Sequence, residues 1–322
     1  MATHVRLAIT TGDPDGIGTE VASKALFRLG PKRGVQFILW RDSSCPSRFL
    51  NRLDKRFTRI TFAHFEDFWL SREKWNSSHL IDICSPHSAA HWVVESAKLC
   101  LKKQIQGLVT GPISKSLILE NGFSEVGHTG LLKSVTGRKN LSMAFLGQHF
   151  NVMLLTDHIP LQEVSSRICS QGVKEALKMA KKDFICRLPK SRQRLPIGLL
   201  GLNPHSGEGG ILGREEVDIL KPLIKWASQK GLNVQGPLVP DAAFLPSQWG
   251  RYSLYLSLYH DQGLIPFKLA HESTGSVHLT LGLPFIRVSV DHGTAKDIFL
   301  KDKAKDASMY ESISMALKMS KG

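Results

Sequence analysis

Residues 196–210, PIGLLGLNPHSGEGG, give the clearest structural signal in this chain of 322 residues. The apolar run at 197–202 is typical of a strand covered on both faces of a parallel sheet. A helical pattern follows from about 214 to 230. This unit predicts an α/β fold in which the polar turn lies at the carboxyl end of the strand, where such sheets bind ligands.

Similar units repeat along the whole sequence. The alternation of strands and helices predicts mostly parallel strands joined by crossover helices. The basic, proline-flanked stretch 187–196 is expected to be an exposed loop. Strands are predicted over 5–12, 35–40, 107–112, 143–155 (two paired strands), 196–204, 253–260, 276–284 and 285–293, and helices over 17–29, 89–104, from 114, 161–182, 214–230 and 306–319.

The composition indicates a soluble globular protein, with 42% hydrophobic and 22% charged residues. No apolar run approaches the roughly 20 residues of a membrane helix, and the first residues have no signal-peptide pattern. The five cysteines (45, 84, 100, 169 and 186) include no C-x-x-C pair. We therefore expect free thiols, a cytoplasmic location and no membrane partner.

The formal charge of +14 is concentrated in part between residues 178 and 194, which hold seven lysines and arginines. Such a run is typical of a solvated helix face and its following loop. A basic protein also attracts anionic small molecules such as phosphates and dinucleotides. The run has no interleaved aromatic residues and no recognised binding motif, so no nucleic-acid partner is expected.

Two glycine-containing turns connect predicted strands to helices. TTGDPDGIG (10–18) lacks the G-x-G-x-x-G pattern, so no Rossmann fingerprint is present. It is either an anion site at a helix N-terminus or a tight turn in which Asp13 and Asp15 cap the helix. TGPISK (110–115) places Lys115 one helical turn in, where a lysine binds an anion, acts as a base or is solvated.

Three histidines each end an apolar, strand-like run: His158 in LLTDHIPL, His205 in NPHSGEGG and His260 in LYLSLYHDQG. If they converge, they form a divalent-metal site that lowers the pKa of a bound hydroxyl and polarises a carbonyl. Their wide spacing is not a local metal motif, and three separately hydrogen-bonded histidines fit the same pattern. GHTG (127–130) and Asp241 in VPDAAF add further polar groups at apparent helix starts.

These motifs occur in a recognisable order from residue 10 to residue 295, which also includes YHDQGLIPFK and TLGLPFIRVSVDHGTA. Together they resemble the 4-hydroxythreonine-4-phosphate dehydrogenase family of pyridoxal phosphate biosynthesis. The resemblance implies two α/β/α domains like those of isocitrate and isopropylmalate dehydrogenases, with mostly parallel sheets. It places the first domain at 1–127 plus 265–322 and the second at 128–264, in a homodimer whose site lies at the subunit boundary.

The resemblance also implies roles for individual residues. It implies one divalent metal (zinc, magnesium, cobalt or manganese) and NAD, with NADP as the other candidate. The proton acceptor is Lys115 or Asp241, and no spacing argument separates them. The metal ligands would be His158, His205 and His260, with Asp241 near the metal. The residues in contact with the substrate would be His128, Thr129, Lys268, His278 and Arg287. The adenosine-binding residues would be Gly293, Thr294 and Ala295, in a segment similar to the HGSAPDI loop of isocitrate dehydrogenases.

The implied reaction is oxidation of 4-phosphohydroxy-L-threonine to a β-keto acid, which decarboxylates to 3-amino-2-oxopropyl phosphate. Two positions depart from the family pattern: His278 stands where asparagine is usual, and Gly130 where a larger residue is common. Imidazole is bulkier than a carboxamide and can carry charge. The alternative expectation is therefore the same mechanism on another phosphorylated hydroxy acid, of the threonate or erythronate 4-phosphate type.

Overall fold

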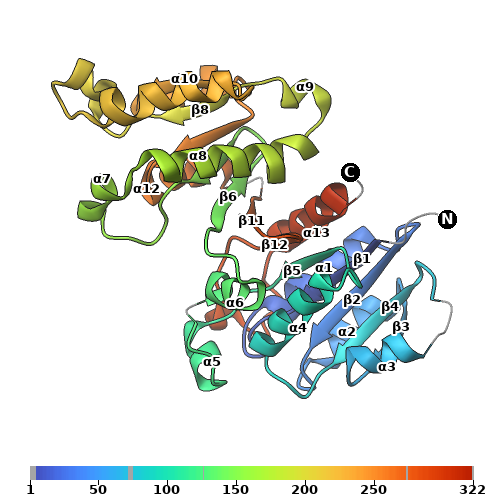
Figure 1. Cartoon of the computed structure of the whole chain (residues 1–322). Helices are drawn as coiled ribbons and strands as arrows, with labels where there is room; N and C mark the ends of the chain where they lie inside the picture. Colours follow the sequence, from blue (N-terminus) through green and yellow to red (C-terminus); the bar gives the residue numbers. More distant parts are fainter. Residues whose placement is uncertain (1–4, 72–74, 126, 273–274, 321–322) are drawn as a thin grey trace. The chain divides into compact units, whose positions relative to one another are not determined.

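The computed structural model describes residues 5–71, 75–125, 127–272 and 275–320 (Figure 1). The chain forms two compact units, Met1–Leu141 with Leu283–Gly322 (unit 1) and Ser142–Gly282 (unit 2). Each unit contains a sheet with helices packed on it, which is the α/β architecture that the sequence predicts. No helix in the described ranges is long and apolar enough to cross a membrane. The five cysteines are free, as expected.

Unit 1 contains a parallel sheet with the strand order β3-β4-β2-β1-β5-β12. One face packs on α4 and α6 through a core that includes Trp40 and Trp92. Helix α13 packs against β1, β5 and β12, and α1 packs against α13 and α2. The elements are β1 (Val5–Thr10), α1 (Gly18–Leu29), β2 (Val35–Arg41), α2 (Ser47–Asp54), β3 (Thr58–Phe62), α3 (Phe65–Leu70), β4 (His79–Cys84), α4 (Ala89–Leu101), β5 (Gly107–Thr110), α5 (Lys115–Glu120), α6 (Gly127–Thr136), β12 (Ile286–Ser289) and α13 (Ala307–Ser320).

Unit 2 contains a mixed sheet with the order β11-β6-β7-β10-β8-β9. Strands β11, β6 and β7 pair antiparallel, whereas β7, β10, β8 and β9 run parallel. The apolar strand predicted at 197–202 is β8, and all four of its residues are buried. The elements are β6 (Ser142–Leu146), β7 (Asn151–Leu154), α7 (Val164–Arg167), α8 (Ser170–Met179), α9 (Lys190–Gln193), β8 (Ile197–Leu200), α10 (Lys221–Gln229), β9 (Val234–Leu238), α11 (Pro240–Ala243), β10 (Leu254–Ser257), α12 (His260–His271) and β11 (Val277–Leu281).

The structure differs from the sequence-based expectation in two segments. The helix expected over 161–182 is broken, because Ile168 and Cys169 have extended backbone between α7 and α8. The Cys169 sulfur accepts a hydrogen bond from the Gly172 N–H at 3.4 Å and so caps the second helix. The stretch 187–196 is not wholly a loop, since it contains the short helix α9, although much of it is exposed as expected.

The unit boundaries also differ from the predicted ones. Unit 2 begins at Ser142 rather than 128 and ends at Gly282 rather than 264. A boundary at 264 would divide α12, which continues to His271. Helix α6, which starts at Gly127, packs against α4 and therefore belongs to unit 1.

Candidate active site

In unit 2, the three histidines and Asp241 follow the carboxyl ends of four neighbouring parallel strands. His158 follows β7, His260 follows β10, His205 follows β8 and Asp241 follows β9. The strand order β7-β10-β8-β9 places these four ends side by side along one edge of the sheet. This edge is where open α/β sheets bind ligands, as the sequence predicts.

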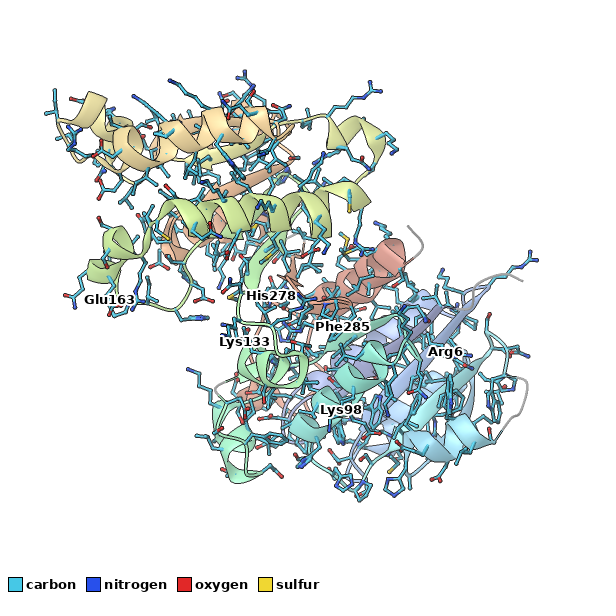
Figure 2. All side chains as sticks on the ribbon, viewed as in Figure 1. Arg6, Lys98, Lys133, Glu163, His278 and Phe285 are labelled. Carbon is cyan, nitrogen blue, oxygen red and sulfur yellow. The ribbon has the colours of Figure 1, made fainter. Side chains whose placement is uncertain are left out.

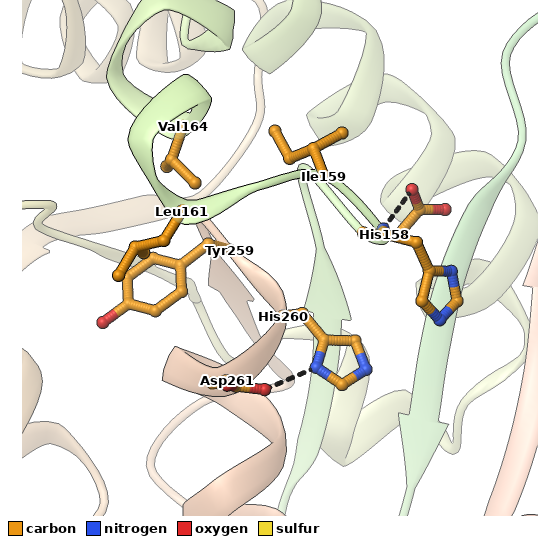
Figure 3. A pocket seen from close by; sticks show the side chains of 8 residues that line it. His158, Ile159, Leu161, Val164, Tyr259, His260 and Asp261 are labelled. Atoms are coloured by element: carbon orange, nitrogen blue, oxygen red, sulfur yellow. Dashed lines mark hydrogen bonds and ion pairs between the residues drawn. The ribbon is translucent and has the colours of Figure 1, made fainter.

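The structure brings two of these histidines together. The His158 and His260 ring centroids are 5.4 Å apart, and the rings are tilted by 41°. Both line a cavity of about 440 Å³, with Ile159, Leu161 and Tyr259 among its apolar lining residues (Figure 3). Two imidazoles that bind one cation at about 2.1 Å have centroids roughly 5 Å apart. The pair therefore has a spacing that fits two ligands of a single metal ion.

A carboxylate fixes the orientation of one of the two rings. His260 Nδ1 lies 2.7 Å from Asp261 Oδ1, so in the neutral imidazole Nδ1–H donates and Nε2 keeps its lone pair. Figure 3 shows this second nitrogen on the side that faces His158. Metal-binding histidines commonly donate their other N–H to a carboxylate in this way, which fixes the tautomer and raises ligand basicity.

His205 lies on a separate turn with an unusual backbone. His205, Ser206 and Glu208 all have positive φ, at 51°, 52° and 42°. This region is unfavourable for residues with a Cβ, and such residues are concentrated at functional sites. Glu216 fixes the start of the turn: it is fully buried and accepts hydrogen bonds from the N–H groups of Leu202 (2.7 Å) and Asn203 (2.8 Å).

One chain does not gather a complete set of metal ligands. Within the part of the chain that the structure describes, no three His, Cys, Asp or Glu residues are placed to hold a metal ion. His158, His205 and Asp241 are all exposed. Imidazole and carboxylate are groups that bind divalent cations, and His158 and His260 are the predicted ligands whose rings lie together.

Two predicted substrate residues of unit 2 lie in different settings. Lys268 is exposed on α12, beside the exposed Leu269 and three residues after the exposed Ile265. His278, labelled in Figure 2, is buried in β11 and pairs in register with Phe145 of β6. The two rings stack with centroids 5.0 Å apart. His278 is therefore positioned by aromatic packing.

In unit 1, the two predicted strand-to-helix turns are bonded to each other. The Asp13 N–H donates to the Pro112 carbonyl, and the Ser114 N–H donates to Asp13 Oδ1, both at 3.0 Å. Asp13 is only 1% exposed. Gly12 has φ +85°, and a Cβ there would lie 2.1 Å from the Pro112 oxygen. Asp13 is thus a structural tie between the turns; it does not cap α1, whose N-cap is Ile17 and receives no side-chain hydrogen bond.

The predicted cofactor segment lies against the first of these turns. The Ile17 N–H donates to the Thr294 carbonyl at 2.9 Å, and Lys296 pairs with Asp15 at 2.6 Å. Gly293 is exposed, and a Cβ there would meet nothing within 4 Å. The space beside this glycine is therefore open, and the binding of a dinucleotide by this segment stays a prediction.

Arg287, in β12, is 1% exposed and donates to Thr110 Oγ1 at 2.6 Å. Burial lowers the pKa of its guanidinium. Removing the cation from water is costly, and an anionic ligand offsets that cost. This environment fits the predicted contact with a phosphate or carboxylate.

The remaining predicted residues of unit 1 belong to α5 and α6. Lys115 is the first residue of α5 and is exposed. His128 and Thr129 are half-buried in the first turn of α6. A Cβ at Gly130 would lie 2.9 Å from the Glu125 Cβ. The glycine at this position therefore allows the preceding segment to pack closely against α6.

Sequence reasoning missed some residues that position the site. Glu216 lies thirteen residues after Asn203 and no motif marks it. Lys296 is another, since its ion pair with Asp15 joins segments 281 residues apart. The role of Asp261 could have been predicted from the sequence, because a carboxylate commonly orients a metal-binding histidine and Asp261 directly follows His260.

Comparison with known proteins identifies relatives over the whole chain. The family model described as "Pyridoxal phosphate biosynthetic protein PdxA" matches residues 78–316. A 4-hydroxythreonine-4-phosphate dehydrogenase from Sulfurihydrogenibium sp. is 34% identical, with 97% of this chain and 98% of the relative covered. A D-threonate 4-phosphate dehydrogenase from Salmonella typhimurium is 33% identical, with the same shares covered.

Solved structures agree with the sequence matches. A 4-hydroxythreonine-4-phosphate dehydrogenase from Klebsiella pneumoniae superposes with a TM-score of 0.80 at 28% identity, covering 100% of this chain and 99% of that one. Isocitrate dehydrogenase from Methylococcus capsulatus gives a TM-score of 0.50 at 14% identity, with 98% of this chain and 85% of that chain covered. The isocitrate dehydrogenase-like fold predicted from the sequence is confirmed.

Proposed function

This chain is a dehydrogenase of the PdxA family, and we propose that it oxidises 4-phosphohydroxy-L-threonine with NAD and one divalent metal. The β-keto acid formed then loses carbon dioxide to give 3-amino-2-oxopropyl phosphate. The observation that carries the proposal is the His158–His260 pair across one cavity, with His260 oriented by Asp261.

The metal would be held by His158, His205 and His260, with Asp241 nearby. When bound, a divalent cation polarises the substrate hydroxyl and makes it more acidic, and NAD accepts the hydride. Lys115 or Asp241 takes the hydroxyl proton; both are exposed and able to exchange it with solvent. NADP remains the other candidate cofactor.

Charged and polar side chains would orient the substrate. Arg287 and Lys268 supply positive charge for the phosphate and carboxylate, and the planar guanidinium of Arg287 binds such anions through two parallel hydrogen bonds. His128, Thr129 and His278 would contact the remaining polar groups. The backbone of residues 293–295 would hold the adenosine end of the cofactor, next to the turn that carries Asp15 and Ile17.

A homodimer would complete the site. Six large apolar side chains of unit 2 are exposed, and Leu269 and Ile211 are each 81% exposed. Ile265 and Leu269 lie one helical turn apart on α12, and exposed apolar side chains that form a continuous patch favour a protein–protein contact. Because one chain does not gather three ligands, we propose that the second copy supplies what the His158–His260 pair lacks. The other four residues are Leu161, Leu212, Leu245 and Ile265.

A second candidate substrate is D-threonate 4-phosphate. The 33% identity to the Salmonella enzyme supports it, and so does His278, whose imidazole packs on Phe145. An imidazole N–H can donate a hydrogen bond to a hydroxyl, whereas an ammonium group has no lone pair to accept one. The two substrates differ in this group.

The test is NADH formation with each substrate in the presence of zinc, cobalt, manganese or magnesium, with the product identified by mass spectrometry. A kcat/KM at least tenfold higher for 4-phosphohydroxy-L-threonine supports the first assignment. A preference for D-threonate 4-phosphate replaces it with the second. No turnover of either substrate with any of these metals would contradict both.

A further inference from the structure

The segment that follows the proposed cofactor loop has a strained backbone. Ala295, Leu300 and Asp302 have positive φ, at 44°, 60° and 54°. None of them is glycine, so each has a Cβ that disfavours this conformation. Consecutive turns connect them, since the Ile298 N–H donates to the Ala295 carbonyl and the Lys301 N–H to the Ile298 carbonyl. Such strain persists only where surrounding contacts enforce it.

One ammonium group on α1 provides several of those contacts. Lys24 Nζ donates to the carbonyl oxygens of Asp302 at 3.0 Å and Ala304 at 2.9 Å. It also lies 2.7 Å from Glu20 Oε1 and 3.2 Å from Asp302 Oδ1. The ammonium therefore joins a helix near the N-terminus of the chain to a segment about 280 residues later. Its i,i+4 ion pair with Glu20 is only one of its contacts.

The partners of Lys24 make further contacts between residues 302–304 and the helices α1 and α2. Glu20 is 2% exposed, and its Oε1 also accepts the Ala304 N–H at 2.8 Å. The Asp302 carboxylate accepts from the Arg52 guanidinium of α2 at 3.2 Å. Arg52 in turn donates to Ser23 Oγ on α1 at 3.1 Å. Residues 302–304 are thus held by both helices.

The other end of the segment is attached to the same helix. The Ile17 N–H, at the N-cap of α1, donates to the Thr294 carbonyl, and Lys296 pairs with Asp15. Helix α1 therefore fixes residues 294–296 at its first turn and residues 302–304 at Lys24. The strained backbone between residues 296 and 302 is therefore attached to α1 at both of its ends.

We propose that Lys24 is a positioning residue for the nicotinamide cofactor: its ammonium holds residues 300–304 on α1, so that the backbone of Gly293, Thr294 and Ala295 stays in the conformation that binds the nucleotide. This inference rests on the assignment of residues 293–295 to the cofactor. Lys24 itself does not touch the cofactor. Without it, the left-handed residues relax and the competent conformation becomes one of several.

The test is a pair of lysine-to-methionine variants of the full-length protein. Lys24→Met keeps the aliphatic length and removes the charge, while Lys55→Met, at the exposed end of α2, is the matched control. If the competent conformation falls to about a tenth of the population, the apparent Kd for NAD rises about tenfold. NAD binding is measured by titration calorimetry, well below the Tm of each variant.

Two further readouts separate positioning from a general loss of stability. Hydrogen exchange of residues 295–304, measured without cofactor, is expected to be faster in Lys24→Met than in the wild type and unchanged in Lys55→Met. The KM for the phosphorylated substrate and kcat at saturating NAD are expected to stay within about twofold, because only the competent fraction changes. A merely structural role would lower the Tm without a change in the Kd for NAD.

If Lys24→Met does not fold, Glu20→Gln/Lys24→Met replaces it, because the neutral amide oxygen still accepts the Ala304 N–H and leaves no buried charge unpaired. Unchanged Kd and unchanged exchange in the variant that folds overturn the role of Lys24 and leave the proposed function intact. Failure of the wild-type protein to bind NAD or NADP is a different result, which overturns the cofactor assignment and this inference with it.

Discussion

At the carboxyl edge of the unit 1 sheet, the candidate Asp13 is buried and hydrogen-bonds a neighbouring turn, whereas at the carboxyl edge of the unit 2 sheet the side chains of His158, His205 and Asp241 are exposed. Backbone hydrogen bonds join the Asp13 turn to Pro112 and to Thr294, and the Asp13 carboxylate accepts a hydrogen bond from the Ser114 N–H. The backbone turns of unit 2 are also hydrogen-bonded, for example by Ser206 to the Pro237 carbonyl. Among the candidate side chains that the structure describes there, the rings of His158 and His260 lie together.

This difference bears on how each edge would bind the ligand proposed for it. A turn already fixed by buried hydrogen bonds loses little conformational entropy when a nucleotide binds, which favours a preformed cofactor site. Separate, exposed ligands come together only when a cation neutralises and orders them, and metal binding then couples to assembly. We therefore expect changes to the exposed candidate ligands of unit 2 to affect activity more than stability, and changes to the buried Asp13 of unit 1 to do the reverse.

The largest expected effect is that of His205→Ala on turnover. A metal acting as a Lewis acid contributes several kcal/mol, and about 1.4 kcal/mol is a factor of ten, so kcat/KM should fall at least about 1,000-fold. Because Glu216 holds the start of the turn without the imidazole, the Tm should change by less than about 2 °C. NADH formation, bound metal and thermal unfolding measure these quantities.

Glu208→Ala is the control, since Glu208 is also exposed and left-handed on this turn but has no proposed role. It should keep wild-type turnover. Full activity and full metal content in His205→Ala would refute the ligand assignment for His205.

The next effect concerns the orientation of His260. Asp261→Ala removes the acceptor that fixes the ring, and such partners of metal ligands typically contribute 10–100-fold in affinity. We expect metal affinity to fall by about that factor, as measured by calorimetric titration with zinc. Asp261→Asn should recover part of the loss, because its amide oxygen accepts the same N–H. Equal affinities in wild type and Asp261→Ala would show that Asp261 does not position the ring.

A smaller effect is expected in unit 1, where it should appear in stability. Asp13→Ala removes the buried acceptor of the Ser114 N–H, and a hydrogen bond to a charged group contributes about 2 kcal/mol. The free energy of unfolding, from denaturant titration, should fall by about that amount. Asp15→Ala should cost less than about 0.5 kcal/mol, since its ion pair with Lys296 lies at the surface. Equal losses in both variants would mean that Asp13 is not a tie between the turns.

The sequence predicts the strands best where burial is continuous. Strands β8 and β10 are buried along their length, and their apolar runs stand out for that reason. The sequence predicts no element between residues 47 and 84. Here β3 is an edge strand with partly exposed residues, α3 is only six residues long, and the buried strand β4 is an exception whose apolar run is interrupted by Asp82. The break at Ile168 was missed because a sulfur cap has no helix-stop pattern of the glycine or proline kind.

In the candidate site, too, the sequence predicts some features and misses others. Topology alone predicts that residues after neighbouring parallel strands share one edge, and His158, His205, His260 and Asp241 do so. Contacts that depend on the packing of distant segments, such as Lys24 with Asp302, leave no periodic pattern. Whether four strand ends make one metal site depends on the directions of their side chains, which periodicity does not encode.

The smallest predicted effect concerns helix α4 of unit 1 and appears in the pH dependence of folding stability. Burial raises the pKa of Glu95 on α4 to about 7, helped by the charge of Glu66 and opposed by His64 and Lys98. The unfolded carboxyl ionises near its ordinary value of 4.5, so folding stability falls as pH rises from there to about 7 and is then constant. Because the side chain is partly solvated, the loss is about 1 kcal/mol. Glu95→Gln should therefore unfold at roughly 2 °C higher temperature than wild type at pH 8, with no gain at pH 4; parallel pH profiles would show that Glu95 ionises freely in the folded protein.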